Sequence, residues 1–222
     1  MCIRDRTLQS PLPLGLFAGK WCSYAVAPDL PHDQRQEDGG ALVFDSEPLA
    51  EPLELFGCPQ ATIVLSSDRP VATLAARLSD VRPNGEVTRV TYGVLNLTHR
   101  DGSEAPQPLT PGRRYRVTVP LNGTAQTFPN GHRIRLALST SYWPLAWPPP
   151  RPVRLTVHPA ASRLVLPVRP PRDGDDALRD LGEPVTAPPL VREPIEPERH
   201  DWRVIRDLAS DASTLHVIND AG

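Results

Sequence analysis

Hydrophobic and polar residues alternate with a period of two along several short stretches of this chain. The clearest stretch follows a turn at Asn130-Gly131, where Ile134, Leu136 and Leu138 share one face and polar or small residues occupy the other. Such alternation is typical of a half-buried β-strand, because successive side chains point to opposite faces of a sheet. No segment of helical period reaches three turns with proper caps, so the pattern predicts an all-β fold.

The same pattern predicts further short strands that are separated by turn residues. The expected strands are residues 42–44, 53–56, 61–66, 72–78, 87–97, 114–121, 133–138, 153–157, 164–168, 202–206 and 214–218. Asn84-Gly85 is a strong hairpin signal between two of them, because both residues tolerate the backbone conformation of a tight turn. Strands of this length and number are typical of a β-sandwich or a barrel.

Proline is unusually abundant, at 28 of 222 residues, against about 5% in an average protein. Residues 11–40 combine prolines with a charged run and show no strand period, so they are expected to form a long connecting arm held by Trp21 and Tyr24. An arm of this length fits a chain that wraps a neighbour better than a free-standing domain. Residues 1–10 are expected to be unstructured, and residues 170–197 to run over the surface as a proline- and acid-rich excursion.

The charge balance and the hydropathy exclude several classes of partner. The formal net charge is −2, so no global field attracts nucleic acid or an anionic membrane. No apolar run approaches the roughly 20 residues of a membrane span, and the first residues lack the apolar core of a secretory signal. Because the three cysteines are also sparse, the sequence predicts a cytoplasmic protein without a disulfide framework.

Recognisable catalytic and cofactor motifs are absent from the sequence. A serine nucleophile on an elbow requires Gly-x-Ser-x-Gly, which does not occur, and there is no glycine-rich phosphate cradle. The six histidines show no i, i+2 or i, i+4 pairing, so neither a metal site nor a cofactor is expected. His132 either faces a cleft or holds the turn beside Gly131 through a hydrogen bond. Asp80 either binds a cation or caps the backbone amides of its own turn.

The loop after the strand at residues 133–138 holds the most unusual residues of the chain. It reads Tyr142-Trp-Pro-Leu-Ala-Trp-Pro148, and the prolines end the sheet because proline cannot donate to a ladder. Two roles are open for Trp143 and Trp147. They contact a ligand, by stacking on a sugar ring or by lining an apolar acyl pocket, or they are buried and fill space inside the fold as structural plugs. A rigid loop with two tryptophans is the expected contact of this chain with another molecule.

Four sequence motifs, which follow the same order along the chain, closely resemble the C-terminal domain of the CocE/NonD hydrolases. They are Phe44–Leu49, Leu78–Gly85, Gly93–Arg100 and the segment Gly-His-Arg-Ile-Arg-Leu-Ala-Leu-Ser-Thr-Ser at residues 131–141. This family includes Xaa-Pro dipeptidyl-peptidases, cocaine esterase and α-amino acid ester hydrolases. The resemblance covers about Pro11 to the C-terminus and implies a jelly-roll β-sandwich of the galactose-binding-like type.

The resemblance implies a connecting arm at residues 1–40 and a jelly-roll domain at residues 41–222. In this family the catalytic Ser, Asp and His lie upstream in an α/β-hydrolase domain, and no position of this chain matches them, so no catalytic residue is transferred. The implied role is that of a non-catalytic domain, inert alone, that packs on the hydrolase core and helps to shape its acyl pocket. The chain is accordingly expected to be a piece of a longer serine hydrolase, with the catalytic domain as its partner.

Tyr142, Trp143, Trp147 and His132 are the candidate residues for the pocket or for the interface with that partner. The alternative is a free-standing carbohydrate-binding module that uses Trp143 and Trp147 as a stacking platform. Without the partner, apolar side chains of the arm are expected to lie exposed and to cause self-association. The arm residues in question are Leu16, Phe17, Trp21 and Tyr24.

Overall fold

The fold is described from a computed structural model, which defines residues 4–22, 29–177, 179–180, 182–188, 191 and 195–220. Two compact units divide the chain, and the boundary lies at Pro170. The expected arm at residues 1–40 is therefore not a separate unit, and the single domain expected over residues 41–222 is divided in two. The physical reason is that the arm packs on the strands that follow it, whereas a long proline-rich stretch precedes the last two strands.

All strand pairs of the first unit are antiparallel. One sheet contains β1 (Arg6–Leu8), β10 (Leu155–Val157), β4 (Gln60–Ser67), β11 (Arg163–Val165) and β7 (Arg114–Pro120). A second sheet has the order β2 (Leu42–Asp45), β9 (Arg133–Ser139), β5 (Thr73–Val81), β6 (Val87–Asn96). A two-stranded sheet pairs β3 (Leu53–Gly57) with β8 (Thr124–Phe128). The helices are short, and they are α1 (Arg35–Asp38), η2 (Leu97–His99) and η3 (Pro159–Ala161).

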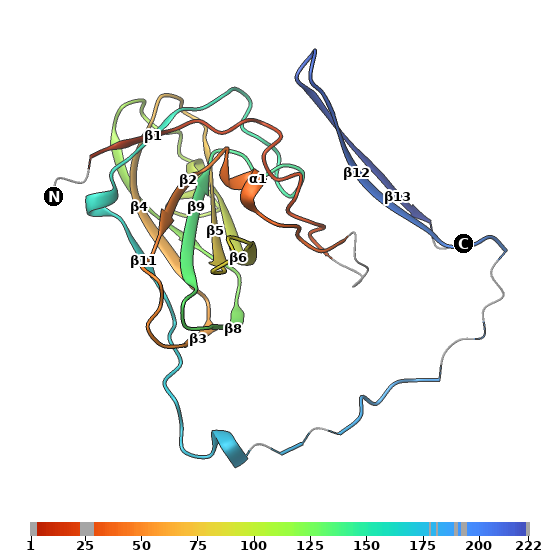
Figure 1. The fold of residues 1–222 in the computed structure, drawn as a ribbon. Coiled ribbons are helices and arrows are strands. Elements are labelled where there is room, and N and C mark those ends of the chain that lie inside the picture. The colour runs from red at the N-terminus through yellow and green to blue at the C-terminus, as the bar shows by residue number, and fades with distance from the viewer. Residues whose placement is uncertain are drawn as a thin grey trace. The chain divides into compact units, whose positions relative to one another are not determined.

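The two larger sheets pack face to face around one hydrophobic core, so the predicted β-sandwich is confirmed (Figure 1). The core side of β9 carries Ile134, Leu136 and Leu138, as the period of two predicts. Leu65 of β4 and Val119 of β7 reach the same core from the opposite sheet. Each fully buried leucine contributes about 1.5–3 kcal/mol of transfer free energy, so this layer is the main source of stability.

The described N-terminal residues are part of the sandwich. β1 pairs with β10, so the expectation of an unstructured segment over residues 1–10 fails there. Leu8 lies opposite Leu155 and is buried in the core. Ser10 N donates to Thr140 Oγ1 at 3.0 Å, and Thr140 N donates to Ser10 Oγ at 3.1 Å. A three-residue strand with one inward leucine is too short to show a period in the sequence.

The second unit contains a short helix, η4 (Asp175–Ala177), and a β-hairpin. The hairpin consists of β12 (Arg199–Asp207) and β13 (Ala212–Asp220), so the two strands predicted near the C-terminus do pair with each other. The Asp207 carboxylate accepts from the Ala209 backbone N–H at 2.9 Å and from the Ser210 hydroxyl at 2.7 Å. These bonds hold the connecting turn, in the manner usual for aspartate at turn positions.

Candidate functional site

The outer face of the β2-β9-β5-β6 sheet is covered by the described part of the arm, residues 11–40. Leu14 and Ala18 of the arm pack with Ala75 of β5 and with Tyr142, which follows β9. All four side chains are buried and form a second, smaller core. The arm was expected to wrap a neighbour, and its described residues wrap their own sheet instead.

A buried ionic cluster joins the arm to the same sheet face. Arg77 of β5 is fully buried, and its guanidinium donates to Gln34 Oε1 and to Asp38 Oδ1 at 3.0 Å each. The second oxygen of Asp38 accepts from Arg135 of β9 at 2.9 Å, and Arg135 also donates to both oxygens of Asp45. The carboxylates of Asp45 and Asp38 raise the pKa of the Arg135 guanidinium. Because a missing member would leave an uncompensated buried charge, the cluster favours a single position of α1.

Glu37 of α1 fixes the turn of the arm that contacts the loop after β9. Its buried carboxylate accepts from the backbone N–H of Gly15 at 2.6 Å and of Phe17 at 2.8 Å. Burial raises the pKa of Glu37, although these two hydrogen bonds act in the opposite direction. Gly15 has a φ of +120°, and a Cβ atom there would lie 2.3 Å from the Trp143 carbonyl oxygen. Only glycine fits this position, and Trp143 N donates to the Leu14 carbonyl at 2.8 Å.

Tyr142 anchors the tryptophan loop, which we define as residues 142–148. Its hydroxyl accepts from Arg89 at 2.7 Å, and its ring centroid lies 5.3 Å from that of Tyr92. Burial raises the pKa of Tyr142, so the neutral phenol is favoured. The side chain is 0% exposed. The structure therefore places Tyr142 in the base of the loop and not on a contact surface.

The two tryptophans of this loop differ in exposure. Trp143 is half-buried, whereas Trp147 is 84% exposed. The exposure of Trp147 rules out the buried plug for that residue and leaves the two binding alternatives. Each tryptophan precedes a proline in the sequence, so the local pattern does not distinguish the exposed residue from the half-buried one.

The arm exposes fewer apolar side chains than the sequence suggests. Leu16 is buried and Phe17 is half-buried, because both lie in the segment that packs on the sheet. Trp21 is 81% exposed. Tyr24 lies outside the described residues. Trp21 and Trp147, together with Phe56 of β3 at 69% exposure, are thus the strongly exposed aromatic side chains in the described part of this unit.

His132 and Asp80, which the sequence treats separately, contact each other. The ring Nδ1 atom lies 2.8 Å from Asp80 Oδ1 and 3.0 Å from Oδ2, and the backbone carbonyl of His132 accepts from Leu49 N at 2.8 Å. His132 therefore holds its turn through a hydrogen bond, which was one of the two alternatives. Asp80 was expected to cap backbone amides of the turn at Asn84-Gly85. Asn84 itself caps this turn, because its side-chain oxygen accepts from Glu86 N at 3.0 Å.

An aspartate that orients a histidine supplies two of the three members of a catalytic triad, and the third member is a nucleophile. Across the part of the chain that the structure describes, no serine or threonine hydroxyl is hydrogen-bonded to the His132 ring. No group of three or more His, Cys, Asp or Glu residues within these ranges could hold a metal ion. The pair therefore lacks a nucleophile, and its geometry supports a structural role at the end of the sandwich.

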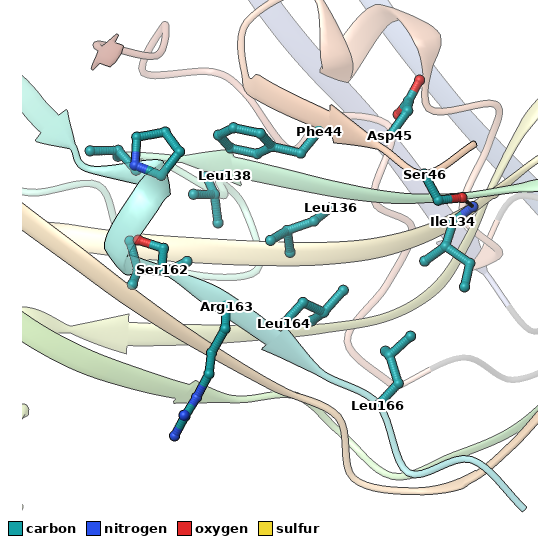
Figure 2. A pocket seen from close by; sticks show the side chains of 13 residues that line it. Phe44, Asp45, Ser46, Ile134, Leu136, Leu138, Ser162, Arg163, Leu164 and Leu166 are labelled. Atoms are coloured by element: carbon teal, nitrogen blue, oxygen red, sulfur yellow. Dashed lines mark hydrogen bonds between the residues drawn. The ribbon is translucent and has the colours of Figure 1, made fainter. Parts of the chain in front are cut away.

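A cavity of about 310 Å³ opens between the edges of the two sheets (Figure 2). In Figure 2 the side chains of Leu136 and Leu138 point toward Leu164 and Leu166, whereas Arg163 points away. The two serine hydroxyls that line the cavity are already hydrogen-bonded to the backbone. Ser46 Oγ accepts from Ile134 N at 3.0 Å, and Ser162 Oγ accepts from Val64 N at 2.9 Å. The cavity thus offers an apolar shape without free polar groups to orient a ligand, and pockets that bind ligands specifically usually contain such groups.

The sandwich with its covered outer face can be compared with known families. Residues 4–177 match the model of the X-Pro dipeptidyl-peptidase C-terminal non-catalytic domain. The chain belongs to this family. The fold expected from the CocE/NonD resemblance is thereby confirmed, and the second unit lies almost entirely outside the match.

The described ranges contain no helix with the length and apolar character of a membrane span.

Known relatives of the domain are longer proteins. A putative serine esterase of Mycobacterium bovis is 33% identical over an alignment of 159 residues, which covers 61% of this chain and 25% of that protein. The cocaine esterase of a Rhodococcus species is 29% identical over 116 residues, 51% of this chain and 20% of the esterase. A solved α-amino acid ester hydrolase shares the fold with a TM-score of 0.63 at 24% identity, over 74% of this chain and 32% of that chain. The chain spans about a quarter of the length of the curated relatives it matches.

Proposed function

We propose that this chain is the non-catalytic domain of a longer serine hydrolase of the CocE/NonD type that cleaves esters or Xaa-Pro amides. The domain packs on the α/β-hydrolase core, and the tryptophan loop forms the contact and helps to shape the acyl pocket. The observation that carries this proposal is the exposed Trp147 side chain on a loop whose base is buried. The match to a non-catalytic domain and the esterase names of two relatives support it.

The loop has the physical properties of a binding anchor. Tryptophan is among the residues that most often dominate interface energies, because its large rigid ring buries much apolar area. The base of the loop is held by Tyr142 and by the close approach of Gly15 to the Trp143 carbonyl. Such a loop loses little conformational entropy when Trp147 is buried by a partner.

The interface can be tested by adding this chain to the separately produced catalytic domain of its parent enzyme. Calorimetric titration should show binding, and Trp147→Ala should weaken it by about thirtyfold, the effect of a loss of about 2 kcal/mol at an interface hot spot. Trp21→Ala is the matched control, because Trp21 is equally exposed but lies on the arm. Unchanged affinity of the Trp147 variant would contradict the proposed contact.

The non-catalytic role has its own test on the isolated chain. Incubation with p-nitrophenyl acetate and with a serine-reactive phosphonate should give neither turnover nor labelling. Stoichiometric labelling by the phosphonate would show a reactive serine and would overturn the proposal regardless of the interface result.

A carbohydrate-binding module is the second candidate, and the exposure of Trp147 is the observation that favours it. An exposed indole can stack on a sugar ring as well as fill an apolar interface. Tryptophan fluorescence titrated with a panel of glycans distinguishes the two functions. A saturable change that is lost in Trp147→Ala would favour the binding module over the hydrolase domain.

A further inference from the structure

The hairpin of β12 and β13 lies beyond the family match, which ends at residue 177. Its strands pair over nine positions, from Arg199 opposite Asp220 to Asp207 opposite Ala212. Within the described residues each of these strands has only the other as a ladder partner. A two-stranded hairpin is at best marginally stable in water, and stable sheets need three or more strands with a hydrophobic face. The hairpin alone therefore has fewer strands than a stable sheet needs.

One face of the hairpin is apolar at its centre. Trp202 lies opposite Val217, and Val204 lies opposite Leu215. These four side chains share a face because directly opposed residues and alternate residues of antiparallel strands point to the same side. The other face is mixed, with charged residues on β12 interleaved with Ile205.

The two free edges of the hairpin differ in charge. β13 contains one formally charged residue, Asp220, at its very end. β12 contains five, which are Arg199, Asp201, Arg203, Arg206 and Asp207. Charged side chains on an edge strand oppose pairing with a further strand. The β13 edge is therefore the one open to another strand.

We propose that β13 pairs antiparallel with β13 of a second copy of this chain, with a two-fold axis through His216, and that the two hairpins form one four-stranded sheet. In this register Leu215 of each copy lies opposite Val217 of the other, and Thr214 lies opposite Ile218. The single acidic residue, Asp220, meets Ala212, so no like charges are opposed. The contact is isologous, as in most homodimers.

The pairing completes the apolar face of the sheet. Across the four strands, one row reads Trp202 and Val217 of one copy, then Leu215 and Val204 of the other. The two-fold axis generates a second row with the same residues. Leu215 and Val217 each gain an apolar neighbour on their second flank, and the sheet reaches the strand number that a stable sheet needs. In this register apolar Leu215 meets apolar Val217 and polar Ser213 meets polar Asn219, so β13 is complementary to a second copy of itself.

Charged substitutions at position 216 test this register in the chain of residues 1–222. Sedimentation velocity should show a dimer, and both His216→Lys and His216→Glu should weaken it about fivefold, since like charges then face each other at the axis. An equimolar mixture of the two variants should form heterodimers more tightly than either variant dimerises. Ile205→Lys is the matched control, because it adds a charge on the same face of β12 and should leave the dimer unchanged.

Hydrogen exchange locates the contact independently of mass. Raising the protein concentration should slow exchange in β13 and leave exchange in the tryptophan loop unchanged. A monomer at 100 µM, a mixture that shows no preference for heterodimers, or slower exchange confined to the arm and the tryptophan loop would each overturn the proposal. None of these results depends on the proposed hydrolase role of the first unit.

Discussion

The two faces of the β2-β9-β5-β6 sheet are stabilised in different ways. The inner face buries Leu74 and Leu138 against the opposite sheet. The outer face carries the fully buried Arg77 and the half-buried Arg135, and both donate to Asp38 of the arm. Apolar burial is non-directional and depends on area, whereas a buried ion pair requires one geometry. The inner face thus supplies stability, and the outer face determines where the arm and the tryptophan loop lie.

The largest effect should come from breaking the outer face. Asp38→Ala removes the carboxylate that is hydrogen-bonded to the fully buried Arg77, and the expected loss is about 3–5 kcal/mol of unfolding free energy. Urea denaturation measures the loss, and acrylamide quenching of tryptophan fluorescence should rise as the arm detaches and uncovers Trp143. The double variant Asp38→Leu with Arg77→Met should recover much of the stability, because a packed apolar pair can replace a buried ion pair. A loss below about 1 kcal/mol in Asp38→Ala would show that the arm is not held by this cluster.

Truncation on the inner face should cost slightly less and leave the arm in place. Leu138→Ala removes a fully buried side chain, and the expected loss is about 2–5 kcal/mol. Acrylamide quenching should stay at the wild-type level in the folded protein, in contrast to Asp38→Ala. Leu208→Ala, at an exposed turn position of the hairpin, is the control and should be neutral. Increased quenching in Leu138→Ala would mean that the two faces are not independent.

The sequence predicts the inner face well and the outer face poorly, for a physical reason. Ile134, Leu136 and Leu138 show their period within one strand, so the strand and its buried side are visible locally. The partners of Arg77 lie 43 and 39 residues away, at Gln34 and Asp38. No local pattern encodes a contact of that separation, and the charged run of the arm looks like a solvated surface.

The candidate site shows the same division. The tryptophan loop is visible from its prolines and its two indoles, but the burial of Tyr142 depends on Arg89 and on an arm more than 100 residues earlier. The contact of His132 with Asp80 spans 52 residues and is equally hidden. The sequence therefore identifies the loop as a candidate, whereas the exposed residue within it emerges only from the fold.

A smaller effect is expected at the point where the arm meets the tryptophan loop. Gly15→Ala combines a positive φ with a Cβ position 2.3 Å from the Trp143 carbonyl oxygen, and it should cost about 2–3 kcal/mol. Gly112→Ala is the matched control, because Gly112 also has a positive φ but no atom lies within 4 Å of the added Cβ. Its cost should be about 1 kcal/mol. Equal losses by thermal denaturation would show that backbone conformation alone, and not contact with the loop, requires Gly15.

The smallest effect concerns the pH dependence of arm docking through Glu37. Burial raises the pKa of Glu37 in the folded chain above its usual value of 4.5, so the folded state binds this proton more tightly than the unfolded state. The resulting stabilisation is fully present below pH 4.5 and is lost as the pH rises through the raised pKa. Glu37→Gln does not titrate, so the unfolding free energy of the wild type minus that of the variant should fall as the pH rises from 4.5 and then level off. A difference that increases with pH would instead mean that the hydrogen bonds from Gly15 and Phe17 outweigh burial, and that the arm is held by a carboxylate anion.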